Sequence, residues 1–352
     1  MTDTFATRLL AWFDVAGRHD LPWQHPRTPY RVWLSEVMLQ QTQVATVIPY
    51  FERFVSALPD LPALGAAPLD RVLALWSGLG YYTRARNLHA AAQLCMERHG
   101  GELPRAVDAL AALPGIGRST AAAIASQAWN DRHAILDGNV KRVLARFHGI
   151  DGWPGAPRVE KQLWAFAQAH AGDPALPDDR LADYTQAQMD FGATLCTRSR
   201  PACIVCPLQA DCVARIEGRQ DELPTPRPSK ELPRREAVVL VLRDADGRIL
   251  LQRRAPTGVW ASLWSLPQFD DAQAADGWLS RHAGDVPLEM CLDDVAHGFS
   301  HYHLTLRSRL HRVERAALIA DDGESAWVSA ADLASFGIPA PIRALLTRLF
   351  EN

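Results

Sequence analysis

The sequence predicts two domains of different fold class. These are a mainly α-helical domain over residues 1–218 and an α/β domain over residues 236–352, joined by a Pro-rich linker at 219–235. Apolar residues recur at helical spacing through the first two thirds of the chain. Four prolines then fall within residues 222–233, and Val- and Leu-rich runs typical of strands follow them. The length of 352 residues fits two domains at roughly 150 residues each.

The helical domain begins with an amphipathic segment, residues 5–15, and a Pro-rich turn follows at 21–23. A long stretch over 32–54 carries apolar residues at helical spacing, and we expect Pro49 to kink or end its helix. Gly or Pro separates most of the later helical segments. These segments cover residues 69–76, 83–98, 119–129, 139–148, 159–169 and 180–192.

The C-terminal domain combines strands with a few helical segments. Residues 237–242 are nearly all Val and Leu, Asp246-Gly247 is a hairpin turn signal, and residues 249–253 resume the strand. Residues 299–310 alternate like another strand. The helices expected in this domain lie at 272–281 and 342–350.

Composition limits the class of protein. The hydrophobic fraction of 48% excludes wholesale disorder, and six cysteines are too few for a disulfide-stapled scaffold. No apolar run reaches the roughly 18 residues of a membrane helix, and the N-terminus lacks a signal-peptide pattern, so we expect a cytoplasmic protein. The net charge of -3 argues against a uniformly basic surface, but it allows one basic face. The cations expected on that face are Arg118, Lys141, Arg142, Arg146, Arg198 and Arg200.

Four of the six cysteines lie close together in the sequence. Cys196, Cys203, Cys206 and Cys212 form the pattern C-x6-C-x2-C-x5-C. In a reducing compartment such a group suits one metal centre, either zinc or an iron–sulfur cluster, since both accept four thiolates. The spacing alone does not separate these two, and it makes four unrelated buried cysteines improbable.

A glycine-rich turn joins two helical segments at residues 113–121. It is not a dinucleotide-binding fingerprint, because Thr120 stands where a third glycine is required and no strand precedes it. A tight turn at Gly115 and Gly117 that opens a helix exposes backbone N–H groups, which suit a DNA phosphate. On glycine content alone, an ordinary helix–helix turn is the favoured interpretation.

Two carboxylates are candidates for acid–base chemistry. Glu36 lies in an apolar helical context, and Asp137 directly precedes a basic helix. A buried glutamic acid with a raised pKa can act as a general acid while an ionised aspartate stabilises a cationic sugar. The structural alternatives are a solvent-facing helix residue for Glu36 and a helix N-cap for Asp137.

Taken together, the motifs resemble a known family. The turn at 113–121, Asp137 and the four cysteines follow each other as in the helix–hairpin–helix DNA glycosylases that carry a [4Fe-4S] cluster. The segments WLSEVMLQQTQVATVIPY at 33–50, GLGYY at 78–82 and LDGNVKRVLAR at 136–146 are similar to adenine DNA glycosylases of the MutY type. The resemblance covers nearly the whole chain and implies removal of adenine mispaired with 8-oxoguanine or guanine in duplex DNA.

The resemblance also implies roles for individual residues. Glu36 matches the general acid that protonates adenine, and Asp137 matches the carboxylate that stabilises the oxocarbenium-like sugar. A base inside a duplex must be flipped out before such chemistry. Gln41 and Tyr81 match residues that wedge the duplex open at the mispair. The positions that match the lining of the adenine pocket are Trp23, Gln24, Gln186 and Asn139.

One departure from the wider superfamily concerns strand cleavage. Ser119 occupies the place where bifunctional members carry a Schiff-base lysine. Since a hydroxyl forms no imine, we expect a monofunctional glycosylase. Lys141 is expected to bind phosphate, and it is also the amine that could trap the abasic product adventitiously.

The C-terminal domain resembles the Nudix-like fold appended in this family. Residues 264–268, Trp-Ser-Leu-Pro-Gln, match the start of that fold, but no Glu-rich metal-binding box follows, so nucleotide hydrolysis is not expected. Phe299, Ser300 and His301 match the loop that reads 8-oxoguanine. His297 and His303 are interpreted as ordinary strand residues.

Three functions remain open on the sequence. The first is a base-excision enzyme that acts as a monomer on duplex DNA, without membrane binding. The second is a pyrimidine-lesion glycosylase with lyase activity, which Ser119 and the extra domain disfavour. The third is a non-catalytic iron–sulfur DNA-binding or redox-sensing module, against which Glu36 and Asp137 speak.

Overall fold

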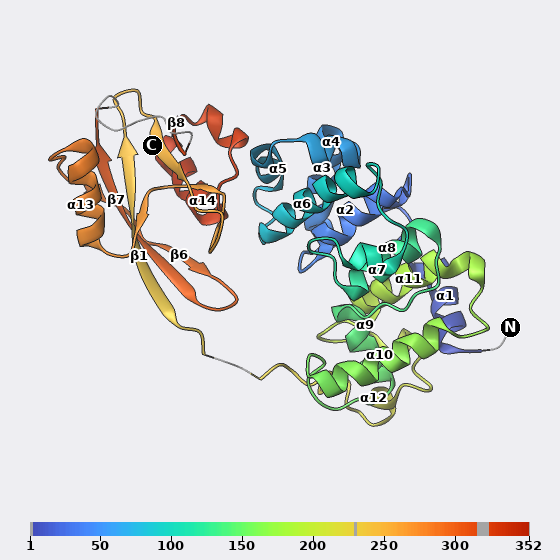
Figure 1. Cartoon of the computed structure of the whole chain (residues 1–352). Coiled ribbons are helices and arrows are strands. Elements are labelled where there is room, and N and C mark those ends of the chain that lie inside the picture. The colour runs from blue at the N-terminus through green and yellow to red at the C-terminus, as the bar shows by residue number, and fades with distance from the viewer. Residues whose placement is uncertain (1–2, 229–230, 315–323, 352) are drawn as a thin grey trace. The chain divides into compact units, whose positions relative to one another are not determined.

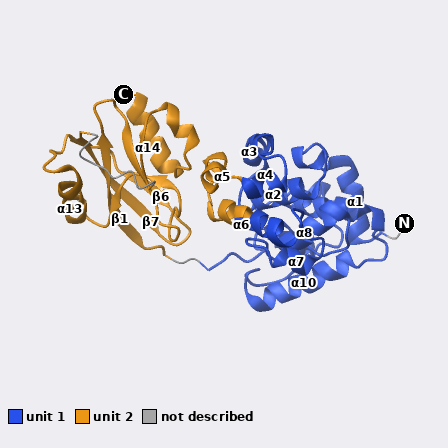
Figure 2. Ribbon diagram, turned by 45° about the horizontal axis from the view of Figure 1, so that its top comes forward, with its two compact units in different colours: residues 1–66, 90–229 blue, residues 67–89, 230–352 orange. Residues whose placement is uncertain are grey.

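The computed structural model describes residues 3–228, 231–314 and 324–351. Its elements divide into two compact units, each built from two stretches of chain (Figure 2). Unit 1 comprises Met1–Ala66 and Ala90–Ser229, and unit 2 comprises Ala67–His89 and Lys230–Asn352. Unit 1 is helical and unit 2 contains a sheet with helices, as the sequence predicts (Figure 1).

The helices of unit 1 follow the apolar periodicity of the sequence in most places. The α-helices and short turns described are α1 (Phe5–Ala16), η1 (Pro22–Gln24), α2 (Pro29–Leu39), α3 (Val44–Ala57), α4 (Leu61–Ala66), α7 (Val107–Ala111), α8 (Arg118–Trp129), α9 (Gly138–Phe147), α10 (Pro157–Ala171), η2 (Asp178–Arg180), α11 (Leu181–Asp190), η3 (Phe191–Leu195), η4 (Cys203–Val205) and α12 (Val213–Ile216). Helix α6 (Thr83–Arg98) begins in unit 2 and ends in unit 1. Among the helices described, none combines the length and apolar character that crossing a bilayer requires.

Helix α8 is the central helix of unit 1. It contacts α2, α7 and α11, and its residues from Ala121 to Gln127 are all buried. Four of these seven residues are alanines. Short side chains let neighbouring helices approach closely, so the site-bearing helices α2 and α11 are held against the same scaffold.

The predicted helix over 32–54 is wrong, because two helices occupy this stretch. Helix α2 ends at Leu39 and α3 begins at Val44. Between them Gln41 has a φ of +58°, a left-handed conformation that a right-handed helix cannot continue through. Pro49, the residue expected to kink or end the helix, lies inside α3. The break therefore comes earlier than the proline signal indicates.

Unit 2 is built around one mixed sheet. In the part described, its strands are β1 (Arg234–Arg243), β2 (Ile249–Arg253), β3 (Trp264–Ser265), β4 (Gln268–Phe269), β5 (Met290–Cys291), β6 (Val295–Gly298), β7 (His303–Arg312) and β8 (Ser325–Val328). The main order is β3-β2-β1-β7-β5, with β4 beside β1, β6 beside β7 and β8 beside β2. The long strands β1 and β7 pair in parallel at the centre; β1 carries buried Val and Leu side chains and β7 buried Leu side chains.

Helices complete unit 2. They are α5 (Leu69–Trp76), α13 (Ala272–Ala283), η6 (Ala331–Ser335) and α14 (Ala340–Glu351). Asp271 caps α13 by accepting a hydrogen bond from the Ala274 N–H at 2.8 Å. The stretch 67–89 is tied to the C-terminal stretch, since the Tyr82 hydroxyl donates to the Ile338 carbonyl at 3.1 Å and Arg86 donates to the Ala261 carbonyl at 2.8 Å.

The predicted strand over 299–310 begins later than expected. Residues 299–302 form the turn of a hairpin between β6 and β7, closed by a hydrogen bond from the Phe299 N–H to the Tyr302 carbonyl at 2.8 Å. His297 and His303 lie in the two strands, as interpreted from the sequence. The turn thus presents Phe299, Ser300 and His301 at the end of a rigid hairpin.

Candidate active site

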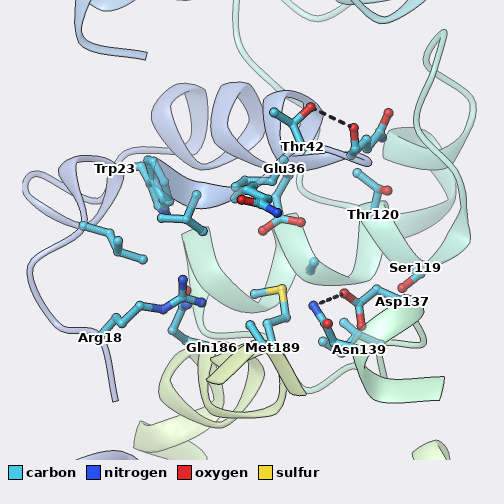
Figure 3. A pocket seen from close by; sticks show the side chains of 18 of the residues that line it. Arg18, Trp23, Glu36, Thr42, Ser119, Thr120, Asp137, Asn139, Gln186 and Met189 are labelled. Carbon is cyan, nitrogen blue, oxygen red and sulfur yellow. Dashed lines mark hydrogen bonds between the residues drawn. The ribbon is translucent and has the colours of Figure 1, made fainter. Parts of the chain in front are cut away.

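A cavity of about 710 Å³ opens in unit 1 (Figure 3). Residues from η1, α2, α8, α11 and the N-terminus of α9 line it, so segments far apart in the sequence meet there. Its volume is in the usual range for a pocket that takes a small organic group. The sequence-predicted residues that line it are Trp23, Glu36, Ser119, Asp137, Asn139 and Gln186.

Glu36 projects from α2 into the wall of this cavity. Its Oε1 accepts a hydrogen bond from Gln127 Nε2 of α8 at 2.7 Å. Burial raises the pKa of the Glu36 carboxyl to about 7, and the charge of Asp137 acts in the same direction, although the Gln127 hydrogen bond opposes both. A carboxyl with this pKa can hold a proton near neutral pH and give it up during a reaction.

Asp137 is both a helix cap and a residue of the cavity wall. It is the N-cap of α9, where Oδ1 accepts from the Val140 N–H at 2.8 Å, and it also lines the cavity. Asn139 Nδ2 donates to its Oδ2 at 3.3 Å (Figure 3). Burial raises the pKa of Asp137, whereas the Val140 N–H and the Arg142 guanidinium stabilise its ionised form and oppose that shift.

Gly192 leaves the space that Asn139, the hydrogen-bond partner of Asp137, occupies. A Cβ at Gly192 would come within 2.5 Å of Asn139 Cβ, a separation that real side chains do not tolerate. Arg142 holds Asn139 from the other side through a 2.9 Å hydrogen bond to Oδ1. The position of Asn139, and hence its contact with Asp137, depends on this close approach.

Behind the cavity wall, the buried Asp190 forms an ion pair with the half-buried Arg18 beside Gln186. Asp190 at the end of α11 has no exposed surface, and its Oδ1 accepts from Arg18 Nε at 2.9 Å and from Gln186 Nε2 at 2.7 Å. Its Oδ2 accepts from the Arg18 backbone N–H at 2.8 Å. Arg18 and Gln186 both line the cavity (Figure 3).

Trp23 and Gln24 differ in their placement. Trp23 lines the cavity and packs edge-on against Phe51 with a ring-centroid distance of 5.4 Å. Gln24 is not among the residues that line the cavity. Its Nε2 donates to the Arg18 carbonyl at 3.0 Å and its Oε1 accepts from the Leu21 N–H at 3.0 Å. Gln24 therefore lies one layer behind the pocket and holds the backbone that carries Arg18.

The glycine-rich turn lies between α7 and α8, with Gly115 at a φ of +78° and Gly117 as the N-cap of α8. The Ser119 hydroxyl accepts from the Leu136 N–H at 2.8 Å and so links α8 to the extended segment before Asp137. Lys141 does not line the cavity, since its Nζ donates to Glu160 Oε1 at 2.6 Å.

The two residues expected to wedge DNA have the same unusual backbone. Gln41 has a φ of +58° and Tyr81 a φ of +49°, and both side chains are exposed. Non-glycine residues rarely adopt this left-handed conformation, and it concentrates at functional sites. In unit 2 the Tyr81 ring also lies 5.4 Å from the Arg84 guanidinium, which stacks on Trp76 as well.

Aromatic side chains support the turn that carries Phe299. Its ring lies 5.4 Å from that of Trp260 and 4.9 Å from that of Tyr302, and the Arg235 guanidinium lies 4.8 Å from the Tyr302 ring. Ser300 and His301 are exposed. The turn therefore rests on the buried rings of Trp260 and Tyr302 and exposes Ser300 and His301, which suits contact with a large partner.

The four cysteines of the C-x6-C-x2-C-x5-C pattern line one small cavity in unit 1 and form no disulfide. Arg146, expected on the basic face, is instead buried here. It donates to Cys196 Sγ at 3.4 Å and to the Thr197 carbonyl at 2.6 Å. No group of three or more His, Cys, Asp or Glu placed to hold a metal ion is found among the described residues. The shared cavity and the all-thiol donor set fit an iron–sulfur cluster.

Comparison with known proteins agrees with this arrangement. Residues 34–169 match the family model described as HhH-GPD superfamily base excision DNA repair protein, and residues 238–348 match the NUDIX domain. The adenine DNA glycosylase of Buchnera aphidicola subsp. Acyrthosiphon pisum is 34% identical over 351 residues, covering 99% of this chain and 98% of that protein. The chain belongs to the adenine DNA glycosylases. The human adenine DNA glycosylase is 37% identical and covers 86% of this chain, which spans 65% of the human protein.

Solved structures place the helical part of this glycosylase in a known fold. A thermostable thymine-DNA glycosylase matches 60% of this chain and 95% of its own, with a TM-score of 0.54 and 26% identity. A non-covalent endonuclease III–DNA complex matches with a TM-score of 0.50 at 24% identity, which shows the fold alone. The protein is therefore a DNA repair glycosylase with a helical base-excision fold and a Nudix-like domain.

Sequence reasoning missed three side chains that organise the glycosylase. Gln127 holds Glu36, Asp190 holds Arg18 and Gln186, and Trp260 supports Phe299. Gln127 is a buried polar residue on an otherwise alanine-rich face, which is the one local signal that pointed to it. Gln186 lies one helical turn before Asp190, but Arg18, the other partner of Asp190, lies 172 residues away in the sequence, and the partner of Trp260 also comes from a different segment.

Proposed function

We propose that this glycosylase removes adenine mispaired with 8-oxoguanine or guanine in duplex DNA and leaves the strand intact. The observation that carries the proposal is the cavity that brings Glu36 and Asp137 together in unlike surroundings. Burial raises the pKa of Glu36 to about 7, and it also raises the pKa of Asp137, but at Asp137 the Val140 N–H and the Arg142 guanidinium stabilise the ionised form and oppose the shift. Two carboxyls whose surroundings favour a proton on one and a negative charge on the other are typical of enzymes that cleave glycosidic bonds.

The reaction then follows from these two groups. The flipped adenine is a poor leaving group until Glu36 gives its proton to a ring nitrogen. The bond between the sugar C1′ and the base breaks with its electron pair going to adenine, and the Asp137 carboxylate stabilises the cationic sugar. Water adds to C1′ and gives its proton to the Glu36 carboxylate, which restores the acid. The products are free adenine and an abasic site.

An excision assay with three duplexes tests the proposal directly. The substrates carry adenine opposite 8-oxoguanine, guanine or thymine, and the product is the alkali-labile abasic site. We expect excision from the first two and none from the third. The Asp137→Asn variant should fail to excise adenine opposite 8-oxoguanine and opposite guanine. Equal excision from all three duplexes would contradict the mispair specificity, and excision of a pyrimidine lesion with strand cleavage would favour the alternative enzyme class.

We further propose that unit 1 grips DNA around the cavity. The N–H groups of the turn at Gly115 and Gly117 suit a backbone phosphate. In unit 1 the exposed left-handed Gln41 is suited to insert beside the mispair, and the exposed left-handed Tyr81 of unit 2 is proposed for the same role. Arg118, which lies over the Trp164 ring at 3.8 Å, is an exposed cation beside the turn. The proposed assembly is one protein monomer on one duplex.

The turn at Phe299, Ser300 and His301 is the proposed reader of 8-oxoguanine. We expect Ser300→Ala together with His301→Ala to reduce the preference for 8-oxoguanine over guanine about 10-fold, with the guanine rate unchanged. The test uses the whole chain, since residues 67–89 belong to the same compact unit as 230–352 and a truncation after Gly218 would leave them without partners. An unchanged preference would exclude the turn as the reader.

We also propose that strand cleavage is weak. Ser119 cannot form an imine, and its hydroxyl already accepts from the Leu136 N–H. Lys141 is the amine we expect to trap the abasic product, with phosphate contact as its main role. Borohydride cross-links that disappear in Lys141→Ala would support this assignment, and efficient strand cleavage by the wild-type enzyme would contradict the monofunctional class.

The four cysteines are the proposed ligands of one [4Fe-4S] cluster. When bound, such a cluster supplies cross-links that fix the loop between Cys196 and Cys212. Arg142 and Arg146 donate to the Cys196 carbonyl and sulfur respectively, so the helix that starts at Asp137 is joined to the loop. An absorbance band at ~400 nm in the purified protein is expected for iron–sulfur ligation, whereas a colourless zinc protein would contradict it.

A further inference from the structure

The buried ion pair at the end of α11 controls which face of the Gln186 amide is turned to the cavity. Asp190 is fully buried, and its Oδ1 accepts from Gln186 Nε2 at 2.7 Å while also pairing with the Arg18 guanidinium. A carboxylate only accepts hydrogen bonds, so it can bind the amide nitrogen but not the amide oxygen of a glutamine. The amide of Gln186 is thereby held in one of its two orientations.

The oxygen of this amide is left for a ligand. Gln186 Oε1 has no hydrogen-bond partner within the residues that the structure describes, although its side chain is only 3% exposed and lines the cavity. Because Gln186 lines the cavity, a donor on a bound ligand can reach this oxygen without displacing a protein hydrogen bond. The site is therefore prepared to receive an N–H group.

Purine bases differ at the corresponding position. Adenine carries a 6-amino donor, whereas guanine carries a 6-oxo acceptor. An amide oxygen attracts the first and repels the second. Sites built to hydrogen-bond one group reject an analogue that lacks it, because their own buried polar atoms then stay unpaired.

We propose that Asp190 is a positioning residue that orients the Gln186 amide so that Oε1 reads the 6-amino group of the flipped purine. The inference rests on the proposed adenine excision and gives it a source of base specificity. Gln24 supports the arrangement from behind, since it holds the Arg18 carbonyl while the Arg18 N–H donates to Asp190 Oδ2. Asp190 and Gln24 thus fix the Gln186 amide, although neither of them lines the cavity that takes the base.

The test compares three purines placed opposite 8-oxoguanine in the same duplex. These are adenine, unsubstituted purine, which lacks a 6-substituent, and hypoxanthine, which carries a 6-oxo group. The measurement is the ratio of single-turnover excision rates, adenine over each analogue, in each variant relative to the full-length wild-type enzyme. Dividing by the wild-type ratio removes the intrinsic leaving-group difference between the bases.

Two substitutions at Asp190 separate positioning from general structure. Asp190→Asn replaces one acceptor oxygen by an N–H donor, so it can bind the Gln186 amide in either orientation, and both ratios should fall below wild type. Asp190→Ala removes the acceptor and frees the amide to rotate, so both ratios should fall at least about 10-fold. A merely structural role for Asp190 would lower the three rates together and leave the ratios unchanged, and that result overturns the proposal.

Gln186→Leu keeps the proposal testable if Asp190→Ala fails to fold. It should lower the ratios as far as Asp190→Ala, and the double variant should lower them no further, because both act through one group. Unchanged ratios in Gln186→Leu overturn the inference. A wild-type enzyme that releases no adenine would instead contradict the proposed function, so the two failures are distinguishable.

Discussion

Replacing the proposed general acid should stabilise the protein while it abolishes activity. The raised pKa of Glu36 means that the folded state holds this proton more tightly than the unfolded chain does. The stabilising effect of that proton is complete at low pH and is lost as the pH rises through about 7. Glu36→Gln keeps the shape and the acceptor for Gln127 Nε2, but it has no charge to bury.

The expected size of this effect follows from the pKa. Raising it from 4.5 to about 7 at 1.36 kcal/mol for each tenfold change makes the ionised carboxyl about 3 kcal/mol less favourable in the folded state at pH 8. At pH 5 most folded molecules carry the proton, and the difference is below about 1 kcal/mol. Glu36→Gln should therefore raise the melting temperature strongly at pH 8 and weakly at pH 5.

Thermal unfolding of wild type and Glu36→Gln at both pH values is the assay, with adenine release measured in parallel. The matched control is Glu52→Gln, an exposed glutamate on α3, which should change little at either pH. A gain in melting temperature that is equal at pH 5 and pH 8 would refute the buried-charge argument. A loss at pH 8 would refute it more directly, since it would mean that the ionised carboxyl stabilises the fold.

Three further outcomes are expected. The excision rate should fall above pH 7 as Glu36 loses its proton and again at low pH as Asp137 gains one, and a profile that stays flat from pH 6 to pH 9 would contradict the role of Glu36. Asp137→Asn should lower the rate about 10³-fold yet leave the circular dichroism spectrum unchanged, because Asn is also a good N-cap. Gly192→Ala should displace Asn139 and slow excision about 10-fold or more, whereas Gly277→Ala, where a Cβ meets no atom within 4 Å, should not change the rate.

Regular secondary structure could be predicted closely where the local pattern was strong. The helices at 69–76 and 83–98 and the strand at 249–253 have the bounds that periodicity and turn residues indicate. The break between α2 and α3 could not be predicted, because the left-handed Gln41 is set by tertiary structure and carries no Gly or Pro signal. The same holds for the hairpin turn at 299–302, which continues the alternation of the strand after it.

Some residues of the candidate site could also be identified from the sequence, whereas others could not. The local sequence identified Asp137 as a cap, and the resemblance supplied its further role and that of Glu36. The partners that tune these groups, such as Gln127 for Glu36, come from a different helix and are chosen by packing. Gln24 shows the limit of transferring positions, since its amide bonds to backbone behind the cavity wall.

Unit 2 is built from two separate stretches of chain, and this affects its folding during synthesis on the ribosome. Residues 67–89 leave the ribosome long before the partners they pack with, since the 140 residues from 90 to 229 must be made first. At about 5–20 residues per second this interval lasts roughly 7–30 s. During that time the hydroxyl of Tyr82 and the guanidinium of Arg86 have no Ile338 or Ala261 carbonyl to bind. In a nascent chain the stretch 67–89 therefore stays without these hydrogen-bond partners until the C-terminal stretch has been made.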